Sequence, residues 1–122
     1  MDFPLTLGHL FERAGRLFPR SEIVSRLPDR SLHRHSYADF VSRAQGLISA
    51  LRKLGLKRGD RVATLMWNHY AHLEAYFAVP CAGGVLHTLN LRLSPDDIAY
   101  IANHAGDQPL VIFEFLRHRR TC

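Results

Sequence analysis

Hydrophobic residues return along the chain at two different spacings, and the alternation between them predicts the order of helices and strands. The clearest helical stripe follows Ser36, where apolar residues recur every three or four positions. Ser36 and Asp39 form a capping-box pattern that predicts the start of this helix, and Gly55 predicts its end. We expect the stripe to face a protein core; its members are Tyr37, Phe40, Val41, Ala44, Leu47, Ile48, Leu51 and Leu54.

Three more helices are indicated by the same spacing and by residues that favour helix ends. Thr6 is a candidate cap for a first helix that Pro19 stops, and Asn68 for a helix that Pro80 bends or ends. The run Ser94–Asp97 combines a cap, a proline at the first helical position and acids in the first turn. In this last helix, which Gly106 ends, we expect the buried side to be Ile98, Ile101, Ala102 and Ala105.

Short apolar runs between the helices predict strands. The runs at 61–67, 85–87 and 110–113 alternate with helices of about ten residues, and this order is typical of a parallel sheet with right-handed crossovers. Gly83 and Gly84 predict a sharp return before the second run. Near the N-terminus, Ile23–Val24 and 32–35 flank a turn at 27–31 and predict a hairpin. The expected fold class is α/β, with helices packed on a partial, mostly parallel β-sheet.

Composition narrows the class of protein. The chain has 122 residues, 47% of them apolar and 22% charged, as expected for one small globular unit. Of the net charge of +5, Arg117, Arg119 and Arg120 contribute three charges, and no basic stripe with interleaved aromatics indicates nucleic-acid binding. No run of about 18 apolar residues indicates a membrane span, and the N-terminus does not resemble a secretory signal. We therefore expect a cytoplasmic protein.

Motifs for catalysis or cofactor binding are missing from the sequence. The pairs His33/His35 and His69/His72 can each share a face, but no third ligand is assignable. There is no G-x-S-x-G elbow and no glycine-rich phosphate loop. Cys81 lies in an apolar run, which should raise the pKa of its thiol and make it inert. We assign no catalytic residue, no cofactor-binding residue and no metal ligand.

The turn that contains His87, Asn90 and Arg92 is a candidate ligand contact. His87, Asn90 and Arg92 follow a predicted buried strand, at the carboxyl end where open α/β sheets place their ligand sites. The alternative is local: Asn90 holds the loop backbone, and Arg92 is solvated or pairs with an acid. The sequence is compatible with both interpretations.

Several separated segments, in order, resemble the N-terminal part of AMP-forming acyl-CoA synthetases, and most of all the fatty-acyl-CoA synthetase branch. The resemblance covers roughly residues 5–113 and is carried by 36–40, 54–63, 67–68, 80–93 and 97–104. It implies the start of a large N-terminal domain. It also implies an enzyme that activates a fatty acid with Mg and ATP as an acyl-adenylate, then joins the acyl group to coenzyme A.

The family's phosphate loop, adenine site and C-terminal lid have no matching segment here. We therefore expect residues 1–113 to form an incomplete AMP-binding-type domain, inactive alone, with 114–122 as a divergent basic tail. The tail resembles the end of a truncated or frame-shifted product. The alternative is a stand-alone interaction module that complements a partner synthetase polypeptide. In either case we expect exposed apolar faces to favour self-association.

Overall fold

A three-stranded parallel sheet forms the centre of the molecule, seen here in a computed structural model that describes residues 6–107 and 111–113. The strands are β3 (Arg61–Leu65), β4 (Val85–Thr88) and β5 (Val111–Phe113), in the order β4-β3-β5. Both pairings are parallel, with Val62 opposite Leu86 and Thr64 opposite Ile112. The predicted α/β class is thereby confirmed.

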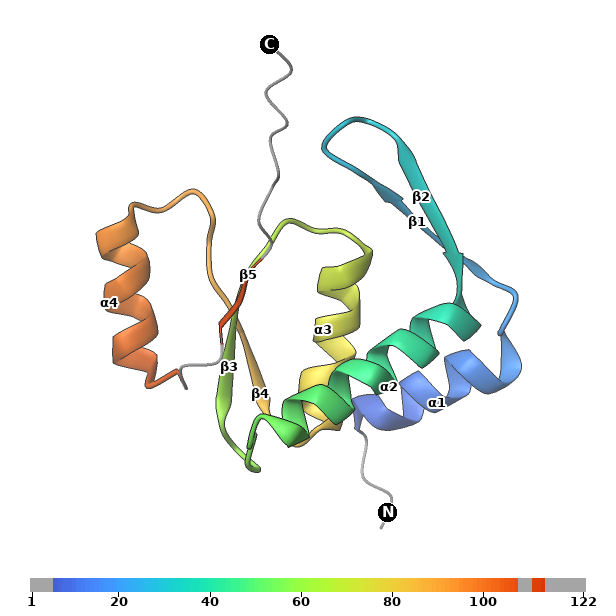
Figure 1. Ribbon diagram of the computed structural model, residues 1–122, viewed down its shortest axis with the longest axis horizontal. Coiled ribbons are helices and arrows are strands. Elements are labelled where there is room, and N and C mark those ends of the chain that lie inside the picture. Colours follow the sequence, from blue (N-terminus) through green and yellow to red (C-terminus); the bar gives the residue numbers. More distant parts are fainter. Residues whose placement is uncertain (1–5, 108–110, 114–122) are drawn as a thin grey trace.

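Helices cover both faces of this sheet (Figure 1). Right-handed crossovers that leave β3 and β4 in opposite directions place α3 (Tyr70–Cys81) and α4 (Pro95–Ala105) on opposite faces. The helices α1 (Leu7–Leu17) and α2 (Tyr37–Lys53) pack on the same side as α3. The predicted tail at 114–122 lies outside the described residues.

The hairpin predicted near the N-terminus is also present. It consists of β1 (Glu22–Arg26) and β2 (Leu32–Ser36), which pair antiparallel with Ile23 opposite His35. Asp29 Oδ1 accepts the Ser31 N–H at 2.9 Å and so fixes the turn between the strands. Figure 1 shows the hairpin standing beside the N-terminal end of α3, apart from the parallel sheet.

The start of α2 agrees with the sequence prediction. Ser36 Oγ accepts the Asp39 N–H at 3.1 Å, and the Ser36 N–H donates to Asp39 Oδ2 at 3.0 Å. The helix passes into Leu54, and Gly55 adopts φ +91°, the left-handed conformation that favours glycine. The predicted apolar stripe stops short of Leu54, whose side chain is 68% exposed, so this residue does not belong to the core.

Two other helix starts differ from the prediction. At α1, Thr6 occupies the cap position but makes no side-chain hydrogen bond to the helix. At α3, the cap is His69 and not Asn68, because His69 Nδ1 accepts the Ala71 N–H at 3.1 Å. Pro80 lies in the last turn of α3, and the helix ends one residue later.

The last helix, α4, is less buried than its sequence pattern suggests. Ser94 Oγ caps it by accepting the Asp97 N–H at 3.2 Å, and Gly106 ends it in the left-handed conformation. The predicted inner residues are on the covered side, but they are only half-buried and no residue of α4 is fully buried. The reason is that α4 has few close neighbours among the other helices and strands of the described residues.

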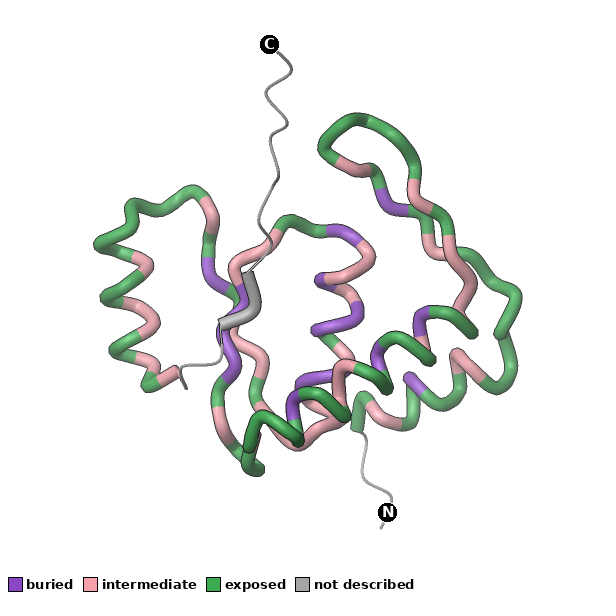
Figure 2. Tube along the Cα trace, viewed as in Figure 1, coloured by how far each residue is buried: buried purple, intermediate pink, exposed green. Residues whose placement is uncertain are grey.

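The core has two adjoining parts on the α1–α2–α3 side of the sheet (Figure 2). One is built from aromatic and small residues of the three helices: Phe11, Phe40, Ala44 and Ala78. The other joins Leu51 of α2 to Val62 of β3 and Val79 of α3. Val62, Ala63 and Thr64 are completely buried, as predicted for a central strand covered on both faces. Trp67, which was assigned to this strand, lies beyond its end and is half-exposed.

Candidate functional site

A hollow of about 360 Å³ opens at the carboxyl ends of β3 and β4. This is the edge of the sheet at which open α/β folds place ligand sites. The loop after each strand and the first turns of α3 form its walls, and the lining residues are Met66, Trp67, Asn68, His72, Tyr76, Thr88, Leu89, Asn90, Leu91 and Arg92. Two of the three sequence candidates, Asn90 and Arg92, therefore share one hollow.

Asn90 has the local role that the sequence left open as an alternative. Its Oδ1 accepts the backbone N–H of Arg92 at 2.9 Å and so closes the loop after β4. Arg92 is exposed, and among the described residues it forms no ion pair. Its guanidinium is the cationic group at this hollow, and the contact of these two residues with a ligand stays a prediction.

His87 does not line the hollow but turns away to bind a carboxylate. Its Nδ1–H donates to Asp107 at 2.7 Å and 2.9 Å from the two carboxylate oxygens. The Asp107 side chain is only 3% exposed. Nearby, Arg61 Nη1 donates to the Ala105 carbonyl oxygen at 2.7 Å. Together these contacts fasten the C-terminal end of α4 to β3 and β4. The hydrogen bond to Asp107 therefore gives His87 a structural role.

The sequence analysis missed a buried polar pair below the hollow. Thr64 Oγ1 and His72 Nε2 are hydrogen-bonded at 3.0 Å, and Thr64 is completely buried. The Tyr76 ring lies 4.8 Å from the His72 ring, one helical turn away. The available signal was a threonine inside an otherwise apolar strand, together with polar aromatic residues four positions apart on one helix face.

A second, more apolar hollow lies between the hairpin turn and the loop after β3. Its volume is about 450 Å³ and its lining residues are Arg26, Leu27, Pro28, Trp67, Asn68 and His69. Trp67 and Asn68 border both hollows, so the loop that carries them separates a polar space from an apolar one. An amphipathic ligand suits such an edge better than a purely polar one does.

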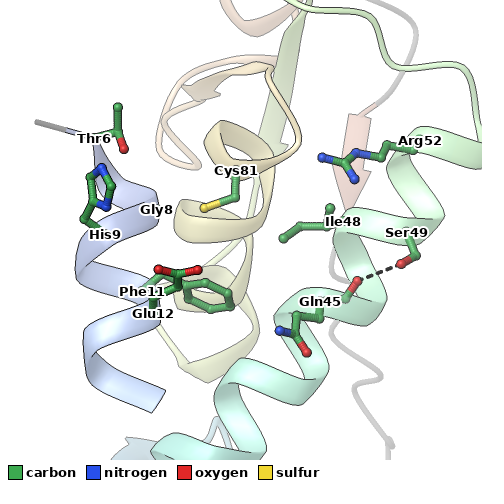
Figure 3. A pocket seen from close by; sticks show the side chains of 10 residues that line it. All are labelled: Thr6, Gly8, His9, Phe11, Glu12, Gln45, Ile48, Ser49, Arg52 and Cys81. Atoms are coloured by element: carbon green, nitrogen blue, oxygen red, sulfur yellow. Dashed lines mark hydrogen bonds between the residues drawn. The ribbon is translucent and has the colours of Figure 1, made fainter. Parts of the chain in front are cut away.

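A third hollow lies at the opposite end of the molecule, between α1 and α2 (Figure 3). Figure 3 shows Cys81 of α3 between the two helices, with His9 and Glu12 on one side and Arg52 on the other. Burial raises the pKa of the Cys81 thiol above its ordinary value, as predicted from its apolar surroundings. A thiol in this state is a poor nucleophile.

The described residues do not form a metal centre, since no group of three or more histidine, cysteine, aspartate or glutamate side chains could hold an ion. None of their helices is long and apolar enough to cross a membrane. The hollow at the edge of the sheet is lined by one arginine, Arg92, and by the side chains of His72 and Tyr76. The more apolar hollow lies beside it.

Comparison with known proteins gives these observations a context. The sequence profile described as AMP-binding enzyme matches residues 11–122. The chain is 57% identical, over 111 residues, to a long-chain-fatty-acid–CoA ligase of Thermus thermophilus. This alignment covers 91% of the chain and 20% of that ligase. It is 43% identical, over 110 residues, to a 3-methylmercaptopropionyl-CoA ligase of Ruegeria lacuscaerulensis. This second alignment covers 90% of the chain and 20% of the relative.

A solved structure has the same arrangement of elements. The N-terminal domain of FACL13 from Mycobacterium tuberculosis, in an inhibitor-bound crystal structure, superposes with a TM-score of 0.78 at 25% identity, covering 88% of this chain and 26% of that one. The chain therefore spans about one fifth of the length of the curated relatives that it matches.

Proposed function

The chain belongs to the AMP-binding enzyme family, as the sequence resemblance predicted, and from this premise we propose that it is the N-terminal part of a fatty-acid–CoA ligase. The proposed reaction activates a carboxylic acid with ATP to an acyl-adenylate and then forms a thioester with coenzyme A. The observation that carries the proposal is the high identity to a ligase of long-chain fatty acids. The lower identity to a ligase of a short thioether acid makes fatty acids the favoured substrate class.

Within that ligase, we assign a scaffold role to these residues. The described side chains do not fit Mg, because they lack a cluster of carboxylates, and the sequence has no glycine-rich loop to hold the triphosphate of ATP. Residues 1–113 would form the first portion of the AMP-binding-type domain, with 114–122 as a basic tail. We also propose a cytoplasmic location for the ligase, which is consistent with the supply of ATP and coenzyme A there.

Fatty-acid-dependent ATP–pyrophosphate exchange tests both the ligase assignment and the scaffold role. The 122-residue chain alone should give the rate of a no-protein blank. A graft in which residues 6–113 replace the aligned segment of the Thermus thermophilus ligase should keep exchange activity. The matched control is the same graft with Thr64→Asp, which buries a carboxylate in the central strand and should abolish folding and activity. A folded but inactive graft would refute the ligase assignment, and exchange by the chain alone would refute the scaffold role.

The same graft tests ligand contact at the hollow. We propose that Arg92, as the exposed cation beside Asn90, contacts an anionic part of a substrate. Arg92→Ala should then raise the KM for ATP or for the fatty acid with little change in protein stability. Arg58→Ala, at an exposed arginine outside the lining of the hollow, is the control. Equal kinetic constants in both variants would assign Arg92 to the solvated surface.

A second candidate is an interaction module that complements a partner synthetase polypeptide. It is supported by the sheet, because β4 and β5 pair only with β3 among the described residues and each leaves an outer edge. The half-buried face of α4 points to the same conclusion. The chain should then co-elute with a Thermus thermophilus ligase that lacks its aligned segment and restore exchange. Separate elution would refute this candidate, and sedimentation velocity of the chain alone would reveal self-association.

A further inference from the structure

Aromatic and histidine rings hold the hairpin against α3. The His33 ring stacks on the Tyr70 ring with centroids 4.1 Å apart, and the His35 ring meets Tyr70 edge-on at 5.6 Å. The two histidine rings lie 5.2 Å apart, because residues two positions apart in a strand point to the same face. We call His33, His35 and Tyr70 the ring cluster.

His35 is the unusual member of the ring cluster. Both of its ring nitrogens, Nδ1 and Nε2, are buried without a hydrogen-bond partner among the described residues. A neutral imidazole tolerates this position at some cost, since one donor and one acceptor are left unsatisfied. An imidazolium would place a charge and two unsatisfied donors there, which costs considerably more. The docked hairpin therefore selects the neutral form.

The charged groups around His35 do not offset that cost. Glu74 of α3 is already bound by Arg43 of α2, at 2.6 Å from Nε and 3.2 Å from Nη2. Asp39 of α2 is engaged by the capping box of Ser36. Both carboxylates near His35 thus have partners, and neither accepts a hydrogen bond from the ring.

These surroundings determine the direction in which the pKa of His35 is shifted. Burial lowers the pKa of His35 below its ordinary value of 6.5, and the neighbouring His33 lowers it further. Glu74 raises the pKa of His35, Arg43 lowers it, and Asp39 raises it. The Arg43 guanidinium also lies 5.5 Å from the centre of the Tyr70 ring, so a positive charge borders the ring cluster from α2.

We propose that the hairpin is an acid-released flap, in which protonation of His35 detaches β1 and β2 from α3 and opens the apolar hollow beside Trp67. The hairpin turn supplies Arg26, Leu27 and Pro28 to that hollow. Release of the flap would remove one wall and increase the solvent exposure of Trp67, which is already half-exposed.

The direction of the pH dependence follows from proton linkage. In the docked hairpin the pKa of His35 is lowered, whereas in the released hairpin it is ordinary, about 6.5. The released form therefore takes up a proton first as the pH falls. Docking is at full strength above about pH 7 and weakens below about pH 6.5, by about tenfold per pH unit for one proton, until the lowered pKa is reached.

Hydrogen exchange of the full 122-residue chain tests the flap. Amide exchange is measured between pH 7.5 and pH 5.0 by mass spectrometry and corrected for the intrinsic rate at each pH. Opening of residues 22–36 should rise about tenfold per pH unit below about pH 6.5, while peptides from α2 and α3 stay protected. Fluorescence of Trp67, the single tryptophan of the chain, should follow the same pH curve.

Two substitutions of His35 and two control substitutions complete the test. His35→Phe and His35→Leu remove the titrating ring, so hairpin exchange should become independent of pH in whichever variant retains its circular dichroism spectrum. His33→Phe in the ring cluster and His104→Gln on exposed α4 should keep the acid response. The proposal is overturned by flat hairpin exchange in the unaltered chain, by an acid response that persists without His35, or by parallel opening of α2 and α3.

Discussion

The same substitution, glycine to alanine, should act in opposite directions at two positions of this fold. A methyl group added at Gly46 in α2 would meet no atom within 4 Å apart from its chain neighbours and the backbone of its own helix. A methyl group at Gly84 would lie 3.1 Å from Val79 Cγ1 and 3.2 Å from Leu56 Cδ2. It would also lie 3.3 Å from the carbonyl oxygen of Asp60. Gly46→Ala should therefore stabilise the chain and Gly84→Ala should destabilise it.

The expected magnitudes follow from the two environments. Gly46→Ala improves the helix propensity of an exposed interior position and should add about 0.5–1 kcal/mol to the free energy of unfolding. At Gly84 the surroundings cannot simply move aside, because Val79 is completely buried. The Asp60 carbonyl oxygen also accepts the Val85 N–H at 2.8 Å. Overpacking of this kind costs about 1–3 kcal/mol.

Urea unfolding followed by far-ultraviolet circular dichroism measures both changes. With a slope of about 1.5 kcal/mol per molar urea, Gly46→Ala should raise the midpoint by roughly 0.3–0.7 M. Gly84→Ala should lower it by about 0.7–2 M. The double variant keeps the transition in a measurable range, and its shift should equal the combined shifts of the single variants. Midpoints that move in the same direction, or an unchanged midpoint for Gly84→Ala, would refute the packing described here.

Three further predictions concern single side chains. Leu51→Ala should cost about 2–5 kcal/mol of unfolding free energy because Leu51 is 1% exposed, whereas Leu54→Ala should cost less than about 1 kcal/mol because Leu54 is 68% exposed; equal urea midpoints would contradict this. Burial raises the pKa of Cys81. In a variant whose other cysteine is replaced by serine, the Cys81 thiol should therefore react with Ellman's reagent at pH 8 more slowly than glutathione does. The difference between the two rates should narrow as the pH rises. An equal rate at pH 8 would argue against burial. His87→Leu leaves the buried Asp107 carboxylate without its donor and should destabilise α4 by about 1–3 kcal/mol, seen as faster amide exchange there; exchange unchanged from the native chain would refute the fastening role.

Helix starts that depend on neighbouring residues were predictable from the sequence. Ser36 and Asp39 exchange both hydrogen bonds of a capping box within three residues, and Ser94 caps α4 in a similar way. The start of α3 was placed one residue early, because asparagine is a common cap and histidine is not. In the structure the ring nitrogen of His69 accepts the bond that Asn68 was expected to accept.

Features that depend on distant residues could not be predicted from local patterns. The partner of His87 is Asp107, twenty residues away, and the fold alone brings them together. Trp67 belongs to an apolar run, but β3 ends at Leu65, which lies opposite Phe113 of β5. The sequence is compatible with two roles for Asn90, and the fold shows the local one, a hydrogen bond from the Arg92 N–H.

The strand order β4-β3-β5 bears on how the chain emerges from the ribosome. The central strand is also the first of the three in the sequence, so it leaves the exit tunnel before its neighbours. Each later strand then adds to a free edge, and none has to be threaded between two strands that have already paired. A nascent chain with this order can build its sheet outward during synthesis, because N-terminal segments are free to fold while later residues are still being added.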